Sequence, residues 1–217
     1  MGNQKSDMGY WVLGNKIATQ LSRKGVRSKV STFNHLRIIH LTTMTRAVFP
    51  GTFDPIHYGH IDIALRATQL FDELIVAVYD KPLKNLVFSP EERLELARKA
   101  FEGNPKISVM GFSSLIVEFC RQVNASVIVR GLRVFSDFEH EFRMAHANHR
   151  LAPEIEYLLL ITSEETTFLS STIVREIASL GGDVSSMVPP HVYKALRDHF
   201  ETTNDGQDGR HVTSLRD

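Results

Sequence analysis

Short apolar runs alternate with helical patterns along most of this 217-residue chain, and this alternation restricts the fold more than any other feature. The run Leu74 to Tyr79 is apolar throughout, which is typical of a strand buried on both faces of a parallel sheet. Between the runs, apolar residues recur at helical intervals of three and four. Repeated βα units with short connections predict an α/β fold, a single doubly wound, Rossmann-like, five-stranded parallel sheet with helices on both faces.

The expected elements follow in chain order. Strands are expected at residues 46–49, 74–79, 107–110, 126–129 and 157–161. Helices are expected at residues 61–68, 90–100, 114–124, 137–150, 170–180 and 190–200. The start of the 90–100 helix is the clearest local prediction, because Ser89, Pro90 and Glu92 supply an N-cap, a proline at the first helical position and a capping-box glutamate.

One folded domain is expected over residues 44–201, because 42% hydrophobic content at this length supports one full core. Residues 1–43 carry seven Lys or Arg side chains against one Asp, and they contain no apolar run long enough for a secretory signal or a membrane span. We expect them to form a basic, disordered extension, and residues 202–217 a flexible polar tail. Met44, just before the first strand, favours an upstream start or an added extension over a targeting peptide.

The chain contains a single cysteine, Cys120, which excludes a disulfide within it and fits a reducing compartment. Cys120 shares the apolar face of a predicted helix with Phe119 and Val123, so we expect it to serve packing and not catalysis. We expect a cytoplasmic protein that binds neither nucleic acid nor membrane.

The stretch Pro50–His60, with the sequence PGTFDPIHYGH, joins the first predicted strand to the following helix. N–H groups at a helix start lack intrahelical partners, and the helix dipole is positive there, so an anion is stabilised at this position. Gly51 and Gly59 allow the backbone to approach a ligand closely, Thr52 offers a hydroxyl, and His60 a ring N–H. The alternative is a plain turn with surface histidines. The placement of two histidines, His57 and His60, around the helix start makes this alternative less favoured.

Cationic side chains follow the second and fourth predicted strands. Lys84 comes after the second strand, and Arg130 and Arg133 flank a turn at the end of the fourth. Because the carboxyl ends of parallel strands meet at one edge of a sheet, we expect these cations to lie near bound phosphates. The alternatives are a solvated surface lysine and ordinary surface ion pairs.

A run of hydroxyl groups, Thr166 to Thr172, leads into the predicted 170–180 helix. As N-cap and first-turn residues, Ser170 and Ser171 predict a second anion-binding position, with Arg175 one turn inside the helix. The alternative is a plain helix cap.

A metal site is the other interpretation of the histidines, because His146 and His149 lie three residues apart on a predicted helix. No cysteine, and no acidic residue at an obvious ligand spacing, completes the set. We therefore expect no protein-held metal.

Three motifs carry a resemblance to a known family. His57, Gly59 and His60 form a His-x-Gly-His pattern similar to the signature of the nucleotidyltransferase superfamily, whereas no Walker loop or dinucleotide fingerprint occurs. The segment Arg130–Asn148, with its Arg-Gly-Leu-Arg, Asp-Phe-Glu and Met-Ala-x-x-Asn patterns, resembles the phosphopantetheine adenylyltransferase family. The segment Ser170–Arg175 resembles the Ser-Ser-Thr-x-x-Arg motif of the superfamily, and the resemblance spans about residues 46–200.

This resemblance implies an enzyme that transfers the adenylyl group of ATP reversibly to 4′-phosphopantetheine, giving dephospho-coenzyme A and pyrophosphate. Such a transfer needs in-line positioning and neutralised charge more than a protein nucleophile. The resemblance also implies Mg²⁺ accompanying ATP, a homohexamer, and feedback by coenzyme A.

The resemblance assigns roles to individual residues. It implies contacts with phosphopantetheine for Thr52, Lys84, Ile116 and Arg130. It implies contacts with ATP for Thr52, Phe53, His60, Gly131, Leu132, Arg133, Glu141, Thr166, Thr167, Phe168, Leu169, Ser170, Ser171 and Thr172. His60 is expected to stabilise the transition state, with Lys84 and Arg130 as the other catalytic residues and no protein metal ligand. His57 departs from the family pattern, since many members have threonine there.

Two alternative functions stay open at this point. Nicotinamide mononucleotide adenylyltransferases share the first and last motifs but not the Arg130–Asn148 pattern, and a non-catalytic nucleotide sensor could use the same scaffold. The protonation state of His60 is also open, because a helix N-terminus disfavours imidazolium whereas bound phosphates favour it.

Overall fold

The computed structural model describes residues 44–81 and 86–204. The predictions for residues 1–43, for Lys84 and for the tail from 205 onward lie outside the described residues. Within them, the helix α7 (Pro190–Asn204) continues four residues past its expected end. The Arg197–Glu201 ion pair and a hydrogen bond from the Thr202 hydroxyl to the carbonyl of Asp198 (2.6 Å) support this extra turn.

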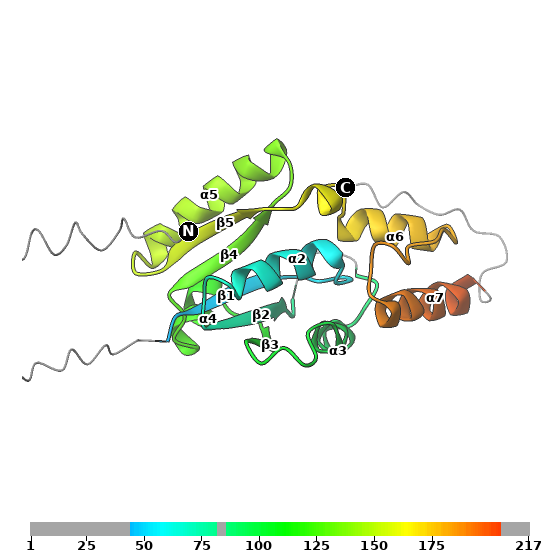
Figure 1. Cartoon of the computed structure of the whole chain (residues 1–217), viewed down its shortest axis with the longest axis horizontal. Helices are drawn as coiled ribbons and strands as arrows, with labels where there is room; N and C mark the ends of the chain where they lie inside the picture. Colours follow the sequence, from blue (N-terminus) through cyan, green and yellow to red (C-terminus); the bar gives the residue numbers. More distant parts are fainter. Residues whose placement is uncertain (1–43, 82–85, 205–217) are drawn as a thin grey trace, which may run out of the picture. The chain divides into compact units, whose positions relative to one another are not determined.

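Five parallel strands form one sheet in the order β3-β2-β1-β4-β5 (Figure 1). The strands are β1 (Arg46–Gly51), β2 (Glu73–Tyr79), β3 (Ile107–Phe112), β4 (Val127–Leu132) and β5 (Glu156–Ile161). This confirms the predicted doubly wound, five-stranded parallel sheet, and every expected strand is present. The chain runs outward from β1 to one edge of the sheet and then returns beside β1 as β4, so the strand order reverses between β1 and β4.

Helices cover both faces of the sheet (Figure 1). Besides α7 they are α2 (Tyr58–Ala67), α3 (Pro90–Ala100), α4 (Ile116–Gln122), α5 (Phe135–Leu151), the single 3₁₀ turn η1 (Glu164–Thr166) and α6 (Ser171–Ser179). The predicted capping box opens α3: the Ser89 hydroxyl accepts from the Glu92 N–H (3.2 Å), and Glu92 accepts from the Ser89 N–H (2.8 Å). The helix α4 is shorter than expected at both ends, and Asn124, in the left-handed region (φ 53°), follows its end.

Alternate residues of β2 supply two separate cores, as the period of a strand requires. Leu74, Val76 and Val78 pack into the core that α2, α3, α6 and α7 cover. Ile75 and Ala77 pack into the other core, with residues of α4. Cys120 is fully buried there, which confirms its predicted packing role, and burial raises the pKa of its thiol to about 12. None of the helices in the described part is long and apolar enough to cross a membrane.

Candidate active site

A cavity of about 600 Å³ opens at the carboxyl ends of the strands, at the point where the strand order reverses. Its opening follows from the strand register: β1 pairs with β4 only at Ala47 and Val48, whereas its pairing with β2 continues to Gly51. Beyond Val48 the two central strands therefore separate. The cavity is lined by the β1–α2 loop, the end of β4, one face of α5 and the start of α6. This is the usual ligand position in an open parallel sheet.

The β1–α2 loop is held in place by the buried ring of Phe53, which is 2% exposed. Phe53 has a left-handed backbone (φ 51°), an uncommon conformation for a bulky residue. Its ring packs edge to face against Phe49 and His60, with centroids 5.5 and 4.9 Å away. A Cβ on Gly51 would lie 2.8 Å from this ring, so the packing requires glycine at that position.

His60, in the first turn of α2, presents a single defined hydrogen-bonding group to the cavity. Its Nδ1 accepts a hydrogen bond from the backbone N–H of His57 (3.3 Å). Burial first, and then nearby His57, Arg133 and Arg130, lower the pKa of His60 well below 6.5. The ring is therefore neutral at pH 7 with its proton on Nε2, and no described residue accepts from that group.

His57 stacks on His60 with ring centroids 3.7 Å apart and an interplanar angle of 24°. Its side chain is 3% exposed, and its Nδ1 has no hydrogen-bond partner among the described residues. Burial, and then the charge of Arg133, lower the pKa of His57 to about 3. Both histidines are therefore neutral donors or acceptors, not cations.

Asp54 and Arg93 form a buried polar frame beneath the loop. The Asp54 carboxylate accepts from the N–H groups of Val87 and Phe88 (both 3.0 Å). Arg93 is fully buried, and its Nη1 donates to the carbonyls of Thr52 (2.7 Å) and Tyr79 (2.8 Å). The ends of β1 and β2 are therefore joined by one guanidinium.

Arg130, on β4, points into the cavity with its orientation fixed by two elements. Its Nε and Nη2 donate to the carboxylate of Glu141 on α5, at distances of 2.7 to 3.1 Å, and its Nη1 donates to the Pro50 carbonyl (2.6 Å). The hydroxyl of Tyr157 on β5 donates to Glu141 as well (2.6 Å). Burial alone would raise the pKa of Glu141, but the hydrogen bonds and charge of Arg130, helped by Tyr157, lower it below its usual range.

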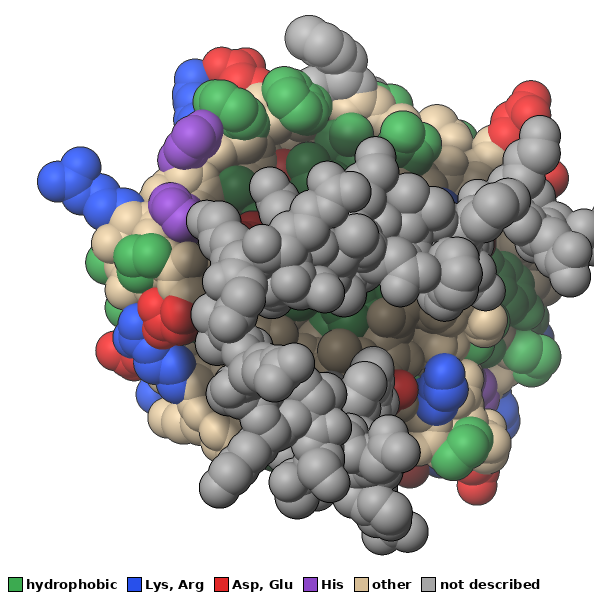
Figure 2. All heavy atoms as spheres, turned by 60° about the vertical axis from the view of Figure 1, so that its left-hand side comes forward, with side chains coloured by type: hydrophobic (Ala, Val, Ile, Leu, Met, Phe, Trp, Pro, Cys, Tyr) green, Lys and Arg blue, Asp and Glu red, His purple; other side chains and the backbone are tan. Residues whose placement is uncertain are grey.

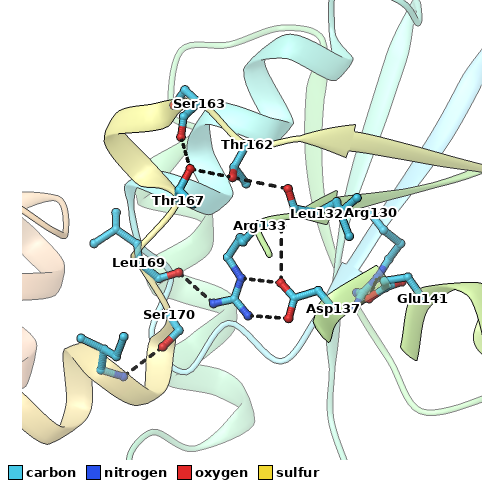
Figure 3. A network of polar contacts seen from close by, with 11 residues as sticks. Arg130, Leu132, Arg133, Asp137, Glu141, Thr162, Ser163, Thr167, Leu169 and Ser170 are labelled. Carbon is cyan, nitrogen blue, oxygen red and sulfur yellow. Dashed lines mark hydrogen bonds and ion pairs between the residues drawn. The ribbon is translucent and has the colours of Figure 1, made fainter. Parts of the chain in front are cut away.

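Arg133 connects the end of β4 to the segment before α6 (Figure 3). Its guanidinium pairs with Asp137 (3.0 and 3.3 Å) and donates to the carbonyl of Leu169 (2.9 Å). Ser170 caps α6 as predicted, since its hydroxyl accepts from the Ile173 N–H (3.1 Å). The Ser171 hydroxyl is not free, because it donates to the Pro55 carbonyl (2.9 Å).

The structure brings most of the predicted site residues to this cavity. Those that line it are Thr52, Phe53, His60, Ile116, Arg130, Gly131, Arg133, Glu141, Ser170, Ser171 and Thr172. Five others belong to the surrounding segments and not to the lining: Leu132, Thr166, Thr167, Phe168 and Leu169. The hydroxyls of Thr166 and Ser163 instead lie 2.9 Å apart, and the Thr167 hydroxyl donates to the Ser163 carbonyl (2.9 Å). Ser163 and Thr167 lie side by side in Figure 3. Phe168 is 57% exposed.

Sequence reasoning missed several residues that build the site, namely Asp54, Arg93, Asp137 and Tyr157. A signal for Arg93 was present: it shares the apolar register of α3 with Leu96 and Ala97, three and four residues later. The other three occupy their positions through contacts that no local pattern reports.

The three carboxylates that line the cavity already have cationic partners. Asp54 faces Arg175 (3.5 Å), Asp137 pairs with Arg133 (3.0 Å) and Glu141 pairs with Arg130 (2.7 Å). Within residues 44–81 and 86–204, no group of three or more His, Cys, Asp or Glu side chains is arranged to hold a metal ion.

Comparisons with known proteins agree with this geometry. Residues 48–177 match the family model described as cytidylyltransferase-like. The phosphopantetheine adenylyltransferase of Herpetosiphon aurantiacus is 50% identical over 159 residues, which cover 73% of this chain and 96% of that protein. Proteins of the same name from Roseiflexus sp. strain RS-1 and Roseiflexus castenholzii are 53% and 52% identical over 154 residues, covering 71% of this chain and 96% of each relative.

Proposed function

The chain belongs to the phosphopantetheine adenylyltransferase family, and we propose that it transfers the adenylyl group of ATP to 4′-phosphopantetheine. The observation that carries this proposal is the cavity at the strand-order reversal, where the neutral His60 and the oriented Arg130 and Arg133 line one space. Such a space can hold two phosphorylated molecules against each other and supplies hydrogen-bond donors and positive charge. Those are the requirements of phosphoryl-type transfer.

In the proposed reaction, a phosphate oxygen of phosphopantetheine attacks the α-phosphorus of ATP. The bond from that phosphorus to the α,β-bridging oxygen breaks, and pyrophosphate leaves with the bond's electron pair. The Nε2–H of His60 donates to the phosphoryl oxygens as negative charge accumulates on them. Arg130 and Arg133 offset the charge of the reacting phosphates. In this scheme no covalent bond to the protein forms, because the acceptor phosphate attacks ATP directly.

We propose that Mg²⁺ enters bound to ATP and is held mainly by phosphate oxygens, as this ion often is. When bound, it would neutralise phosphate charge. Every carboxylate of the described lining is engaged by an arginine. The contacts proposed for His60, Arg130 and Arg133 do not depend on the metal ion.

Pyrophosphate release measured with ATP and separate acceptors tests the proposal. Turnover with 4′-phosphopantetheine and none with nicotinamide mononucleotide is the expected result. Turnover with nicotinamide mononucleotide alone would contradict the assigned acceptor, and ATP binding without turnover of either acceptor would support a nucleotide sensor.

We propose a homohexamer, in agreement with the apolar side chains that α5 exposes. Among these, Phe142 is 50% exposed and Leu151 54% exposed. Figure 2 shows hydrophobic side chains gathered with histidines on the upper part of the molecule, where α5 lies. Exposed apolar patches of this kind mark contact surfaces. Light scattering coupled to size exclusion gives the mass, and a monomer at micromolar concentration would contradict the proposal.

We further propose feedback inhibition by coenzyme A and a cytoplasmic location. Coenzyme A contains the phosphopantetheine and adenylyl groups that the cavity is proposed to join, so it would occupy the same space. Competition with 4′-phosphopantetheine in steady-state kinetics tests the feedback, and cell fractionation tests the location.

A further inference from the structure

Tyr157 lines the cavity but has no part in the transfer chemistry described above. Its hydroxyl donates to Oε2 of Glu141 over 2.6 Å, the shortest of the hydrogen bonds that reach this carboxylate. Burial first, and then the hydrogen bond and charge of Glu141, raise the pKa of Tyr157 above its ordinary value although nearby Arg130 lowers it, so the hydroxyl keeps its proton at neutral pH.

Glu141 depends on this contact because its side chain is buried. The residue is 5% exposed, and a buried carboxylate is costly unless its lone pairs are satisfied. Arg130 donates hydrogen bonds to both carboxylate oxygens, and the Tyr157 hydroxyl donates a further one to Oε2. The plane of the carboxylate is therefore fixed from two elements, β4 and β5.

The position of the Glu141 carboxylate determines how many N–H groups of Arg130 can still donate to a ligand. A guanidinium has five N–H groups. Nε and one N–H of Nη2 face Glu141, and one N–H of Nη1 faces the Pro50 carbonyl. Apart from these bonds, one N–H remains on each terminal nitrogen, and Tyr157 also lies close enough to interact with the guanidinium directly. Two N–H groups are the number that bidentate phosphate binding uses.

Tyr157 also affects the charge that an anion meets. Glu141 and Arg130 are oppositely charged and 2.7 Å apart, so the carboxylate weakens the positive field of the guanidinium. A hydrogen bond that Tyr157 donates to Oε2 of Glu141 stabilises part of the carboxylate's negative charge, which Arg130 would otherwise offset alone.

We propose that Tyr157 is a positioning residue, which holds Glu141 so that Arg130 keeps two N–H groups available for the phosphate of the acceptor. The identity of the acceptor rests on the proposed function. The hydroxyl, not the ring, is the acting group, because the ring packs with the second core.

The first test is steady-state kinetics of Tyr157→Phe, which removes only the hydroxyl. The KM for 4′-phosphopantetheine should rise about fivefold, while the KM for ATP and kcat stay within about twofold, because the lost interaction concerns binding of one substrate. Tyr193→Phe, on α7 and away from the cavity, is the matched control and should change nothing. Equal changes in both KM values, or no change, would overturn the proposal.

A double-mutant cycle with Glu141→Gln identifies the route of the effect. If Tyr157 acts through Glu141, then Tyr157→Phe has no further effect on the KM for 4′-phosphopantetheine in the Glu141→Gln background. The same fold-change in both backgrounds would show a direct role for Tyr157 and overturn the positioning role. Circular dichroism melts of the four proteins check that all are folded.

Binding of inorganic phosphate separates this proposal from the proposed function, since it needs no turnover. Calorimetry should show phosphate binding to the wild-type chain and about fivefold weaker binding to Tyr157→Phe. If the wild-type chain binds phosphate but turns over neither acceptor, the proposed function is contradicted. The difference in phosphate affinity between the wild type and Tyr157→Phe still tests the role of Tyr157 in that case. Equal phosphate affinities, or no binding by the wild type, would overturn the role of Tyr157.

Discussion

The backbone N–H of His57 donates to Nδ1 of His60, and this one bond of 3.3 Å determines which ring nitrogen of His60 faces the cavity. An accepting Nδ1 leaves Nε2 as the protonated nitrogen in a neutral ring. The stacked ring of His57, 3.7 Å away between centroids, keeps the His60 ring from turning. A neutral donor fixed in this way needs no reorganisation when charge develops on the reacting phosphate.

Replacing His60 with alanine should lower kcat about a hundredfold or more, because it removes a donor whose contact strengthens in the transition state. Binding of ATP, measured by calorimetry, should be largely unchanged. His60→Gln is the informative partner variant, since its amide N–H lies near the former Nε2 and should restore about tenfold of the loss. Near-normal turnover in His60→Ala would reduce this residue to a helix cap.

The stability of the folded chain should fall as the pH drops below 6.5, because His57 has a folded pKa of about 3. A histidine in the unfolded chain binds a proton near pH 6.5. Between about pH 3 and pH 6.5 the unfolded state therefore binds more protons than the folded state, and acid favours unfolding. The contribution is fully present above pH 6.5. From pH 6.5 to pH 5 it should decrease by about 2 kcal/mol. Urea titrations at several pH values measure it. His57→Thr should reduce the dependence without abolishing it, because buried His60 also has a lowered pKa. Equal slopes in the variant and the wild type would contradict the assignment.

Much of the fold could be predicted because its signals are local. The apolar runs gave all five strands, and the Ser89–Glu92 capping box lies where the sequence placed it. The cluster of site residues was also predictable, since parallel strands must bring their carboxyl ends together. His60 and Arg130 meet in one cavity for this reason.

The partners within the site were not predictable, because they depend on contacts between distant segments. Arg130 donates to a carbonyl 80 residues earlier, and Arg93 to one 41 residues earlier. No periodicity reports the side-chain direction that such contacts need. The left-handed backbone of Phe53 is likewise imposed by the packing of its ring, against the ordinary preference of the residue.

Arg93→Met should destabilise the chain by about 2 kcal/mol, although it replaces a buried cation by an apolar side chain of similar length. The carbonyls of Thr52 and Tyr79 would lose their donor. The gain from removing the charge offsets part of this loss, because Nη2 of Arg93 is buried without a partner among the described residues. Denaturant titration measures the change, with the exposed Arg98→Met on the same helix as control. An unchanged or increased stability would show that the frame does not depend on the guanidinium.

The thiol of Cys120 should be inert in the native protein, because burial raises its pKa to about 12 and no part of it reaches solvent. A thiol-reactive chromogenic disulfide at pH 8 should therefore modify almost no protein natively and one thiol per chain in concentrated guanidinium chloride. The chain has one cysteine, so the signal belongs to this residue alone. Rapid native labelling would mean that the core over α4 opens readily.

Gly51→Ala should lower both stability and activity, because its Cβ would lie 2.8 Å from the Phe53 ring. Phe53 cannot move without disturbing His60, whose ring centroid is 4.9 Å away. Overpacking of this kind costs about 1–3 kcal/mol. Phe53→Leu removes the ring and is the matched partner: in its background, Gly51→Ala should cost less than half as much, as measured by denaturant titration of the four proteins. If the two losses of stability are additive, glycine is needed at position 51 for its backbone conformation and not to make room for the Phe53 ring.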